Sequence, residues 1–191
     1  MKTLTKLTAI LISLSILMAL AGCGKQEQDK LYTVSSRYMY SGDIVMDADD
    51  AYYFDPPIVL EQNGSGINLG EWRGPAKAYW GFTVPEEGTY DITIIYSRAD
   101  GPEVRGYFEA EKRIGKNKWE DFAQLAFELP PTGEDSEDWS EYVEFWRSGI
   151  YDLPAGTEMR LSMYPDSNLA GDEYFINLQS ITLRKRENAP E

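Results

Sequence analysis

Two stretches within residues 67–97 alternate between apolar and polar side chains. A period of two with a single apolar face predicts two β-strands that each cover a hydrophobic core. Residues 85–88, between the stretches, predict a reversal, because Pro85 cannot donate a ladder hydrogen bond and Gly88 can take a positive φ. The apolar positions of the two stretches are Ala78, Trp80, Phe82, Val84, Tyr90, Ile92, Ile94 and Tyr96.

Short runs of the same kind recur along the chain and are separated by turn residues. Gly115–Lys118 predicts a hairpin tip, residues 153–156 predict a corner, and the aromatic spacing in 139–151 predicts a helical turn or an aromatic-rich loop. No long amphipathic helix is expected, so the pattern predicts an all-β chain, a single antiparallel β-sandwich. Further strands are expected in 31–40, 43–54, 58–62, 104–111, 119–129, 159–163 and 174–183.

The composition limits the chemistry that this chain can perform. It has 191 residues, of which 42% are hydrophobic, enough for one domain with its own core. A formal net charge of −14 opposes binding to nucleic acid and to anionic lipid surfaces, so neither is expected as a partner. With no histidine and one cysteine, the chain cannot form an internal disulfide, a histidine or cysteine zinc site, or an imidazole general base.

Carboxylate pairs are the catalytic resource that remains, as in glycoside hydrolysis. Among 32 acidic residues some pairs lie at a suitable distance by chance, and no stretch sets a carboxylate in an apolar pocket motif. We therefore expect no enzymatic activity. The acidic side chains of 134–144 are expected to form a solvated loop, because they lack a fixed ligand spacing.

Residues 1–22 have the features of a bacterial export signal, in which two lysines precede an apolar run too short to span a bilayer comfortably. The run ends in Leu20-Ala21-Gly22-Cys23, which resembles the lipobox, where the signal is cut before the cysteine. We therefore expect Cys23 to carry a lipid anchor that holds the domain in the cell envelope, outside the cytoplasm. Gly24 follows the cysteine, which resembles cargo of the outer membrane if the cell is Gram-negative. The alternative is a plain signal peptide with an incidental cysteine.

These observations predict four segments. Residues 1–22 form the lipoprotein signal peptide, and residues 23–42 form a tether that includes an edge strand. Residues 43–186 form the β-sandwich, and residues 187–191 form a charged tail.

Two segments resemble the carbohydrate-binding modules of the galactose-binding-like β-sandwich, or jelly-roll, fold that are grouped as families 6 and 35. The first contains Asn68-Leu69-Gly70, the aromatic pair Tyr79-Trp80 and the corner at 84–90. The second, 151–183, contains the corner at 153–156 and ends in a strand that starts at Phe175-Ile176-Asn177. The resemblance implies a non-catalytic domain that binds one sugar in a cleft among the loops at one end of the sandwich.

In that family the sugar is stacked between two aromatic rings and held by an asparagine amide. Trp139, which follows Thr132-Gly133, matches one aromatic position, and Asn177 matches the amide. Glu71 stands where the second ring is expected, with Trp72 beside it, so the resemblance implies a ligand site of Trp139, Asn177, Glu71 and Trp72. The alternatives are that Trp139 packs its loop onto the sandwich and that Asn177 satisfies backbone groups.

The family also has a structural calcium site away from the cleft. Asp47 and Asp49 match its first acids, and Gln179 stands in place of an aspartate, so calcium is the one cofactor that the resemblance implies. Calcium prefers six to eight oxygen ligands, several of them anionic, and the loss of a carboxylate weakens such a site.

The sequence thus predicts a membrane-anchored envelope lipoprotein that binds a glycan weakly, with a dissociation constant of about micromolar to millimolar. The alternative is a protein–protein interaction module on the same scaffold after loss of the sugar site, an alternative that Glu71 and Gln179 favour. Arg98, Arg105 and Arg113 are either ordinary surface charges or, if one lies at the cleft, partners for the carboxylate of a uronic or sialic acid.

Overall fold

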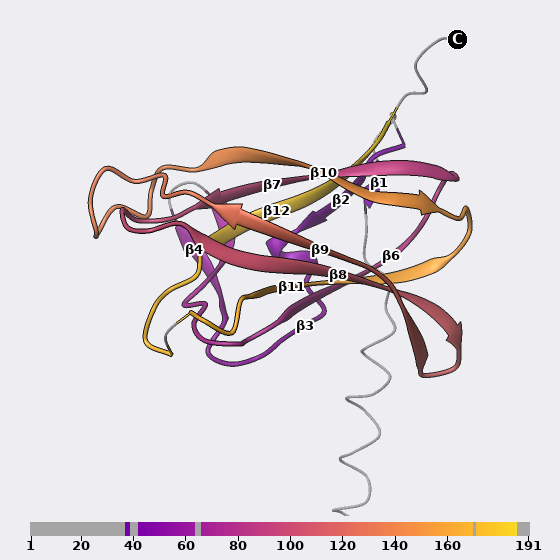
Figure 1. Cartoon of the computed structure of the whole chain (residues 1–191), viewed down its shortest axis with the longest axis horizontal. Helices are drawn as coiled ribbons and strands as arrows, with labels where there is room; N and C mark the ends of the chain where they lie inside the picture. Colours follow the sequence, from indigo (N-terminus) through magenta and orange to yellow (C-terminus); the bar gives the residue numbers. More distant parts are fainter. Residues whose placement is uncertain (1–36, 39–41, 64–65, 170, 187–191) are drawn as a thin grey trace, which may run out of the picture. The chain divides into compact units, whose positions relative to one another are not determined.

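Two antiparallel sheets form the domain, one above the other in Figure 1. The computed structural model describes residues 37–38, 42–63, 66–169 and 171–186, which contain twelve strands and one short 3₁₀ helix, η1 (Ala48–Asp50). The all-β sandwich predicted from the alternation is therefore confirmed. No helix in these residues is long and apolar enough to cross a membrane.

β12 (Asn177–Lys185) is the central strand of the seven-stranded sheet. It pairs along one side with β7, and along the other with β2 and then β5. The other strands of this sheet, with their bounds, are β1 (Arg37–Tyr38), β2 (Ile44–Asp47), β4 (Val59–Asn63), β5 (Gly66–Gly70), β7 (Gly88–Ser97) and β10 (Val143–Leu153).

The five-stranded sheet has the order β3-β6-β11-β8-β9. β8 and β9 form the predicted hairpin, with Gly115 and Lys118 paired at its tip and Asn117 at a φ of 57°. The bounds of these strands are β3 (Tyr53–Phe54), β6 (Ala78–Thr83), β8 (Val104–Gly115), β9 (Lys118–Leu129) and β11 (Glu158–Pro165).

The reversal at residues 85–88 carries the chain from one sheet to the other. β6 pairs with β3 and β11, whereas β7 pairs with β10 and β12, so the two strands belong to opposite sheets and both contribute to the core between them. The Val84 N–H donates to Thr157 O (3.0 Å) and the Gly156 N–H donates to Val84 O (2.8 Å), which ties this reversal to the corner at 153–156.

The core lies where the alternation places it. Each of the eight apolar positions of the 67–97 segment is at most 1% exposed, and Met159, Leu161 and Met163 of β11 are fully buried. Burial of one large apolar side chain stabilises the fold by about 1.5–3 kcal/mol. Trp80 also donates its indole N–H to Asp47 O (3.0 Å), which joins β6 to the end of β2 across the core.

The prediction of a helical turn or a loop at 139–151 is wrong over most of its length. Residues 143–153 form β10, an edge strand that pairs with β7. Phe145 packs edge-to-face on Tyr96, whereas Trp146, its neighbour, is 57% exposed on the other face. Because both faces of this edge strand carry aromatic residues, the period of two is obscured in the sequence.

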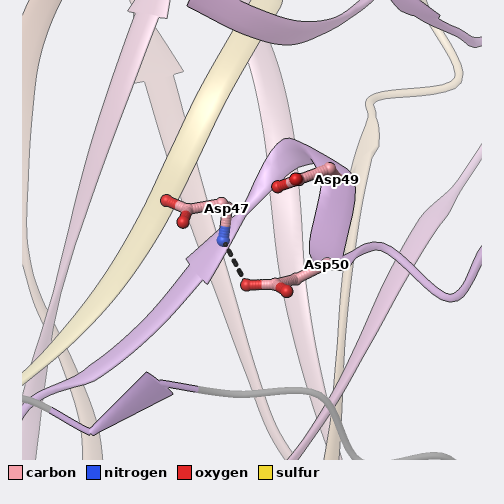
Figure 2. A group of neighbouring side chains, drawn as sticks. All are labelled: Asp47, Asp49 and Asp50. Carbon is pink, nitrogen blue, oxygen red and sulfur yellow. Dashed lines mark hydrogen bonds between the residues drawn. The ribbon is translucent and has the colours of Figure 1, made fainter.

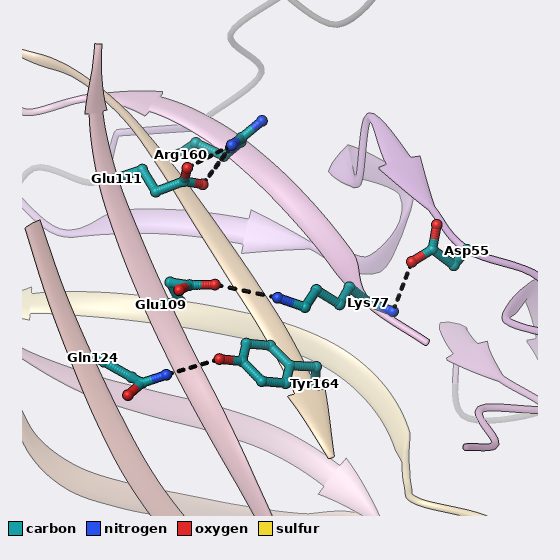
Figure 3. Close-up of polar contacts among 7 residues, drawn as sticks. All are labelled: Asp55, Lys77, Glu109, Glu111, Gln124, Arg160 and Tyr164. Atoms are coloured by element: carbon teal, nitrogen blue, oxygen red, sulfur yellow. Dashed lines mark hydrogen bonds and ion pairs between the residues drawn. The ribbon is translucent and has the colours of Figure 1, made fainter. Parts of the chain in front are cut away.

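Polar side chains cover the outer face of the five-stranded sheet (Figure 3). Arg160 of β11 donates two hydrogen bonds of 2.6 Å to the carboxylate of Glu111 on β8, and Lys77 pairs with Glu109 at 3.3 Å. A bidentate arginine–carboxylate pair is both stronger and more directional than a pair joined by one hydrogen bond. The first pair links the neighbouring strands β11 and β8, and the second reaches from the residue before β6 across β11 to β8.

Candidate ligand-binding site

The end of β7 holds the loop between β9 and β10, residues 130–142. The Tyr96 hydroxyl donates to Pro130 O at 2.9 Å, and the Ser97 hydroxyl donates to Trp139 O at 2.7 Å. Burial raises the pKa of Tyr96 to about 12, so this hydroxyl remains a donor at neutral pH. The rigid strand thereby sets the position of Trp139.

The residue after Ser97 continues this connection. The Arg98 N–H donates to Thr132 Oγ1 at 2.9 Å, and the Thr132 hydroxyl donates back to Arg98 O at 3.1 Å. The backbone N–H groups of Thr132 and Gly133 also donate to Arg98 O. The Thr132-Gly133 element that carries part of the family resemblance is therefore the segment that fastens the loop to β7.

A cleft of about 350 Å³ opens among the loops at this end of the sandwich. Three connections contribute to it, β7–β8, β9–β10 and β11–β12, and their loops lie at the left of Figure 1. We refer to it as the loop-end cleft. Its lining residues are Arg98, Ala99, Asp100, Gly101, Pro102, Glu103, Val104, Arg105, Ser136, Trp139, Asp166, Asn168, Leu169, Glu173 and Tyr174.

Trp139 and Tyr174 form an aromatic pair in the wall of this cleft. Their ring centroids lie 5.7 Å apart at an interplanar angle of 67°, an edge-to-face contact. No sugar ring fits between two rings that touch, so this pair does not make the two-sided stack that the resemblance implies. The two rings form an angled aromatic surface, and a sugar in the cleft can stack its apolar C–H face on this surface.

Glu71 lies next to this aromatic pair, through Tyr174. Arg73 donates to the carboxylate of Glu71 at 2.7 Å, donates to the Tyr174 hydroxyl, and stacks its guanidinium 4.0 Å from the centre of the Tyr174 ring. Glu71 is exposed and has a φ of 52°. Its position supports one side of Tyr174, and it is not among the described residues that line the cleft.

The prediction that Trp72 contacts a ligand is wrong. Its side chain is fully buried, packs edge-to-face on Phe175 with centroids 5.4 Å apart, and donates its indole N–H to Ala76 O (2.9 Å). β5 ends at Gly70, and from there the chain leaves Glu71 exposed and places the Trp72 side chain in the core.

Asn177 starts β12 directly opposite Ser97 of β7. Because paired residues project to the same face, Asn177 shares the face on which Ser97 holds Trp139. Among the described residues, however, the set that lines the loop-end cleft does not include Asn177. The structure therefore places Trp139 in the cleft and Asn177 beside the base of its loop.

Two of the three arginines considered from the sequence line the cleft. Arg98 is 7% exposed, whereas the side chain of Arg105 is 53% exposed and lies 3.9 Å from Asp166. Arg113 is on the β8–β9 hairpin, where it pairs with Glu158. Sequence alone could not distinguish these positions.

Asp166 is the anchored acid of the cleft. It accepts hydrogen bonds from the Asn168 N–H (3.0 Å) and from the Tyr107 hydroxyl (2.9 Å), and these donors lower the pKa of its carboxyl. It is therefore ionised at neutral pH and serves as an acceptor that holds the β11–β12 loop against β8.

The predicted calcium ligands lie at the junction of β2 and η1. Carboxylate oxygens of Asp47, Asp49 and Asp50 fall within 4.8 Å of one another, and Asp50 also accepts from the Asp47 N–H at 3.2 Å (Figure 2). Gln179 precedes Ser180, the β12 residue that pairs with Asp47, and its side-chain amide nitrogen lies close to Gly66. Three carboxylates of this spacing fit part of a calcium ligand set. Asp50 was not predicted.

Sequence reasoning also missed Tyr174, the aromatic partner of Trp139. The pattern assigned Tyr174 to the last strand, but β12 begins at Asn177 and Tyr174 remains in the loop, with a single bridge to Arg73. The sequence did offer one signal for Tyr174: it lies three residues before Asn177, which matches the ligand-binding amide of the resembling family.

Solved structures show how far this fold is shared. The chain is 19% identical to the C-terminal family 6 carbohydrate-binding module of a laminarinase, LamC, from Zobellia galactanivorans (TM-score 0.53; 75% of this chain, 99% of that one). It is 19% identical to a family 6 module of Cellvibrio mixtus lichenase 5A, solved with cellotriose (TM-score 0.51; 75% and 97%). It is 13% identical to a family 35 module from Clostridium thermocellum (TM-score 0.55; 75% and 98%).

These similarities confirm the resemblance to family 6 and family 35 modules at the level of the fold. No family model matches the sequence, and no curated protein matches it. Cys23 and the segments 1–22 and 187–191 lie outside the described residues, as does most of the tether.

Proposed function

We propose that this domain binds a glycan in the loop-end cleft without chemical conversion. The observation that carries the proposal is the aromatic pair of Trp139 and Tyr174 in the wall of a cleft of about 350 Å³. A pyranose has an apolar C–H face and a polar rim, so an aromatic surface receives the face while neighbouring polar groups bind hydroxyls.

The fold supports this proposal, since modules that share it include one solved with cellotriose. Fold alone does not determine function, so the proposed glycan binding rests on the cleft and its aromatic pair. Its size suits one or two sugar rings, and a small contact area limits affinity to about the micromolar to millimolar range.

Titration with a glycan panel tests the proposal, with two tryptophan variants as a matched pair. Trp139→Ala removes one ring of the aromatic pair and should abolish measurable binding, while Trp146→Ala, on the outer face of the seven-stranded sheet, should leave binding unchanged. Equal binding by wild type and Trp139→Ala would refute the site. Absence of binding to envelope, plant and host glycans would refute the function.

We also propose that the domain is held in a bacterial envelope by lipid on Cys23. The support is the Leu20-Ala21-Gly22-Cys23 sequence at the end of the export signal. Expression of the full chain with a labelled fatty acid should label the wild type and not Cys23→Ser. Label on the variant would overturn the anchor without affecting the glycan proposal.

A protein–protein module is the second candidate, and the exposure of Trp146 favours it. Trp146 of β10 starts a row of paired residues on the outer face of the seven-stranded sheet. The row continues through Thr93 of β7 and Thr182 of β12 to Val45 of β2, so it crosses four strands. Exposed tryptophan is common at protein interfaces. A pull-down from envelope extract in the presence of free sugar should lose its partner with Trp146→Ala and retain it with Trp139→Ala.

A further inference from the structure

β9 is a long edge strand whose outer side is unprotected. It pairs with β8 alone, and residues 123–129 do so in unbroken register. Among the described residues the other edge strands are short or irregular: β1, β3 and β4 have two, two and five residues, and two register shifts interrupt β10. A regular edge strand presents a row of unpaired N–H and C=O groups, which proteins usually block with charges, proline or bulges. Residues 123–129 contain one charged side chain, Glu128, and no proline or glycine, so this edge is open to a further strand.

The sandwich is also open on the side where β9 and β10 lie next to each other (Figure 1). Phe122 and Leu125 of β9 and Phe145 of β10 are half-buried there and pack against the core. Two hollows, of about 300 and 450 Å³, are lined by residues of both strands, and the first reaches the buried side chains of Phe108 and Ile150. Apolar surface at the mouth of a core favours a covering element, because its burial removes it from water.

The charges along this side are balanced. The larger hollow is lined by two cations, Arg105 and Arg147, and by two anions, Glu103 and Glu128. The whole chain, in contrast, has a formal charge of −14. Because the screening length at physiological salt is about 8 Å, a contact here responds mainly to these nearby charges. A second copy of the chain therefore meets no net repulsion at this hollow, and a strongly basic partner finds no net negative charge to attract it.

We propose that this protein forms a dimer through β9. The β9 strand of a second copy pairs with it in antiparallel orientation, in the register that places the two copies of Ala126 opposite each other at the two-fold axis. The two five-stranded sheets then continue as one sheet across the interface. This inference is independent of the proposed glycan binding.

This register places apolar side chains opposite each other on the core side of β9. By the alternation of the strand, Ala123, Leu125, Phe127 and Leu129 share the face that packs on the core, where Phe127 and Leu129 are buried. Leu125 of one copy faces Phe127 of the other, and Ala123 faces Leu129. Directly opposed apolar pairs of this kind stabilise a sheet.

The same register is also complementary on the outer face. Gln124 projects to that face, where it donates a hydrogen bond to the Tyr164 hydroxyl at 2.9 Å (Figure 3). In the dimer Gln124 of each copy faces Glu128 of the other. A side-chain amide has two N–H donors, so Gln124 can also donate to this carboxylate. No like charges are opposed within residues 123–129.

Neighbouring registers lack this complementarity. A centre one residue earlier places Glu128 opposite Phe122, and a centre two residues earlier places it opposite Glu120, a like charge. A centre one residue later places Gln124 opposite Pro130, which has no N–H to donate. The register centred on Ala126 thus pairs the whole of 123–129 with itself and ends where proline stops the strand.

The expected dimer is weak and depends on concentration. An antiparallel pair of this length contributes about one backbone hydrogen bond per residue. A single strand pair is smaller than a standard protein interface, which buries about 1,600 Å² in total. Sedimentation of the full-length chain in mild detergent should therefore show a reversible monomer–dimer equilibrium.

Cross-linking tests the register directly. The full-length chain with Cys23→Ser has no other thiol, so a cysteine introduced on β9 is the single site of disulfide formation. Ala126→Cys should form a disulfide dimer under mild oxidation, because residues opposed in an antiparallel pair have Cα atoms about 4.5–5.5 Å apart, within disulfide range. Gln124→Cys is the matched control on the same face. In the proposed register its two copies lie about 13 Å apart along the strands, too far to be joined.

Two lysine variants test the interface without cross-linking. Ala126→Lys opposes two like charges at the two-fold axis and should weaken the dimer, whereas Gln124→Lys opposes a lysine to Glu128 and should not. Because the variants gain the same charge, we expect their dimer dissociation constants to differ by about ten-fold, with Ala126→Lys the weaker. Thermal melting of each variant shows that it is folded.

The outcomes are decisive for the dimer. A wild-type chain that stays monomeric at all concentrations would overturn the proposal, including the case in which β9 accepts a strand from another protein. A dimer that cross-links equally well through Gln124→Cys, or that is weakened equally by the two lysine variants, would overturn the β9 register. A glycan titration of Ala126→Lys should match wild type, so loss of the dimer and loss of glycan binding are separate results.

Discussion

The side chain of Ser97 and the main-chain carbonyl of Trp139 are joined by a hydrogen bond of 2.7 Å across 42 positions of the chain. Ser97 is fully buried at the end of β7, a strand paired on both sides. Because β7 is hydrogen-bonded to a strand on each side, the position of Ser97 is fixed, and the bond fixes the loop that carries Trp139 in turn. The aromatic wall of the cleft is therefore preorganised by the sheet.

Ser97→Ala should destabilise the domain by about 1 kcal/mol, because the carbonyl of Trp139 loses its donor in a part-buried place. For a chain of this size that corresponds to a fall in melting temperature of about 2–4 °C. Binding of the glycan should weaken as well, since Trp139 is less well held. Thermal melting and titration of the same sample check both effects, and Ser136→Ala, at an exposed serine of the same loop, should not lower the melting temperature.

Trp72→Ala should destabilise the domain by about 3–5 kcal/mol, the usual effect of truncating a fully buried large aromatic side chain. The variant also leaves Ala76 O without its indole donor and removes the contact with Phe175. Urea denaturation measures the change, and Trp146→Ala, which removes an exposed tryptophan, should differ from wild type by less than about 0.5 kcal/mol. A small effect of Trp72→Ala would contradict the burial described here.

The pH dependence of stability should include a contribution from Asp166. Hydrogen bonds from Asn168 and Tyr107 lower the pKa of its carboxyl in the folded state, so the unfolded state binds a proton more readily. The contribution is fully present above the ordinary pKa of about 3.9 and is lost as pH falls through the lower folded value. Denaturation curves between pH 6 and 2 should show a shallower acid decline for Asp166→Asn than for wild type.

Calcium binding stays a prediction, and thermal stability tests it. If the carboxylates of Asp47, Asp49 and Asp50 hold the ion, millimolar calcium should raise the melting temperature and a chelator should lower it, because a ligand that binds the folded state stabilises it. Magnesium should have a smaller effect, since it prefers a tighter octahedral shell. Asp49→Asn should remove the calcium response, and an unchanged melting temperature with calcium would contradict the site.

The sequence by itself determined which side chains face the core in most strands. Alternation is a local property, set by the geometry of an extended chain, so Trp80, Phe82, Tyr90 and Ile92 could be assigned without knowing their partners. The hairpin at Gly115–Lys118 and the corner at 153–156 were likewise local, because their turns depend on the residues within them. Edge strand β10 escaped this reasoning, since both of its faces carry aromatic side chains.

Only the tertiary structure decided what the loop-end cleft contains. Tyr174 meets Trp139, and Arg98 lines the same cleft, because strand order brings three loops from distant parts of the chain to one end of the sandwich. Strand order depends on long-range pairing, such as that of β12 with β7, which no local pattern specifies. For the same reason the sequence could not tell that Arg98 and Arg105 line the cleft whereas Arg113 lies on a hairpin.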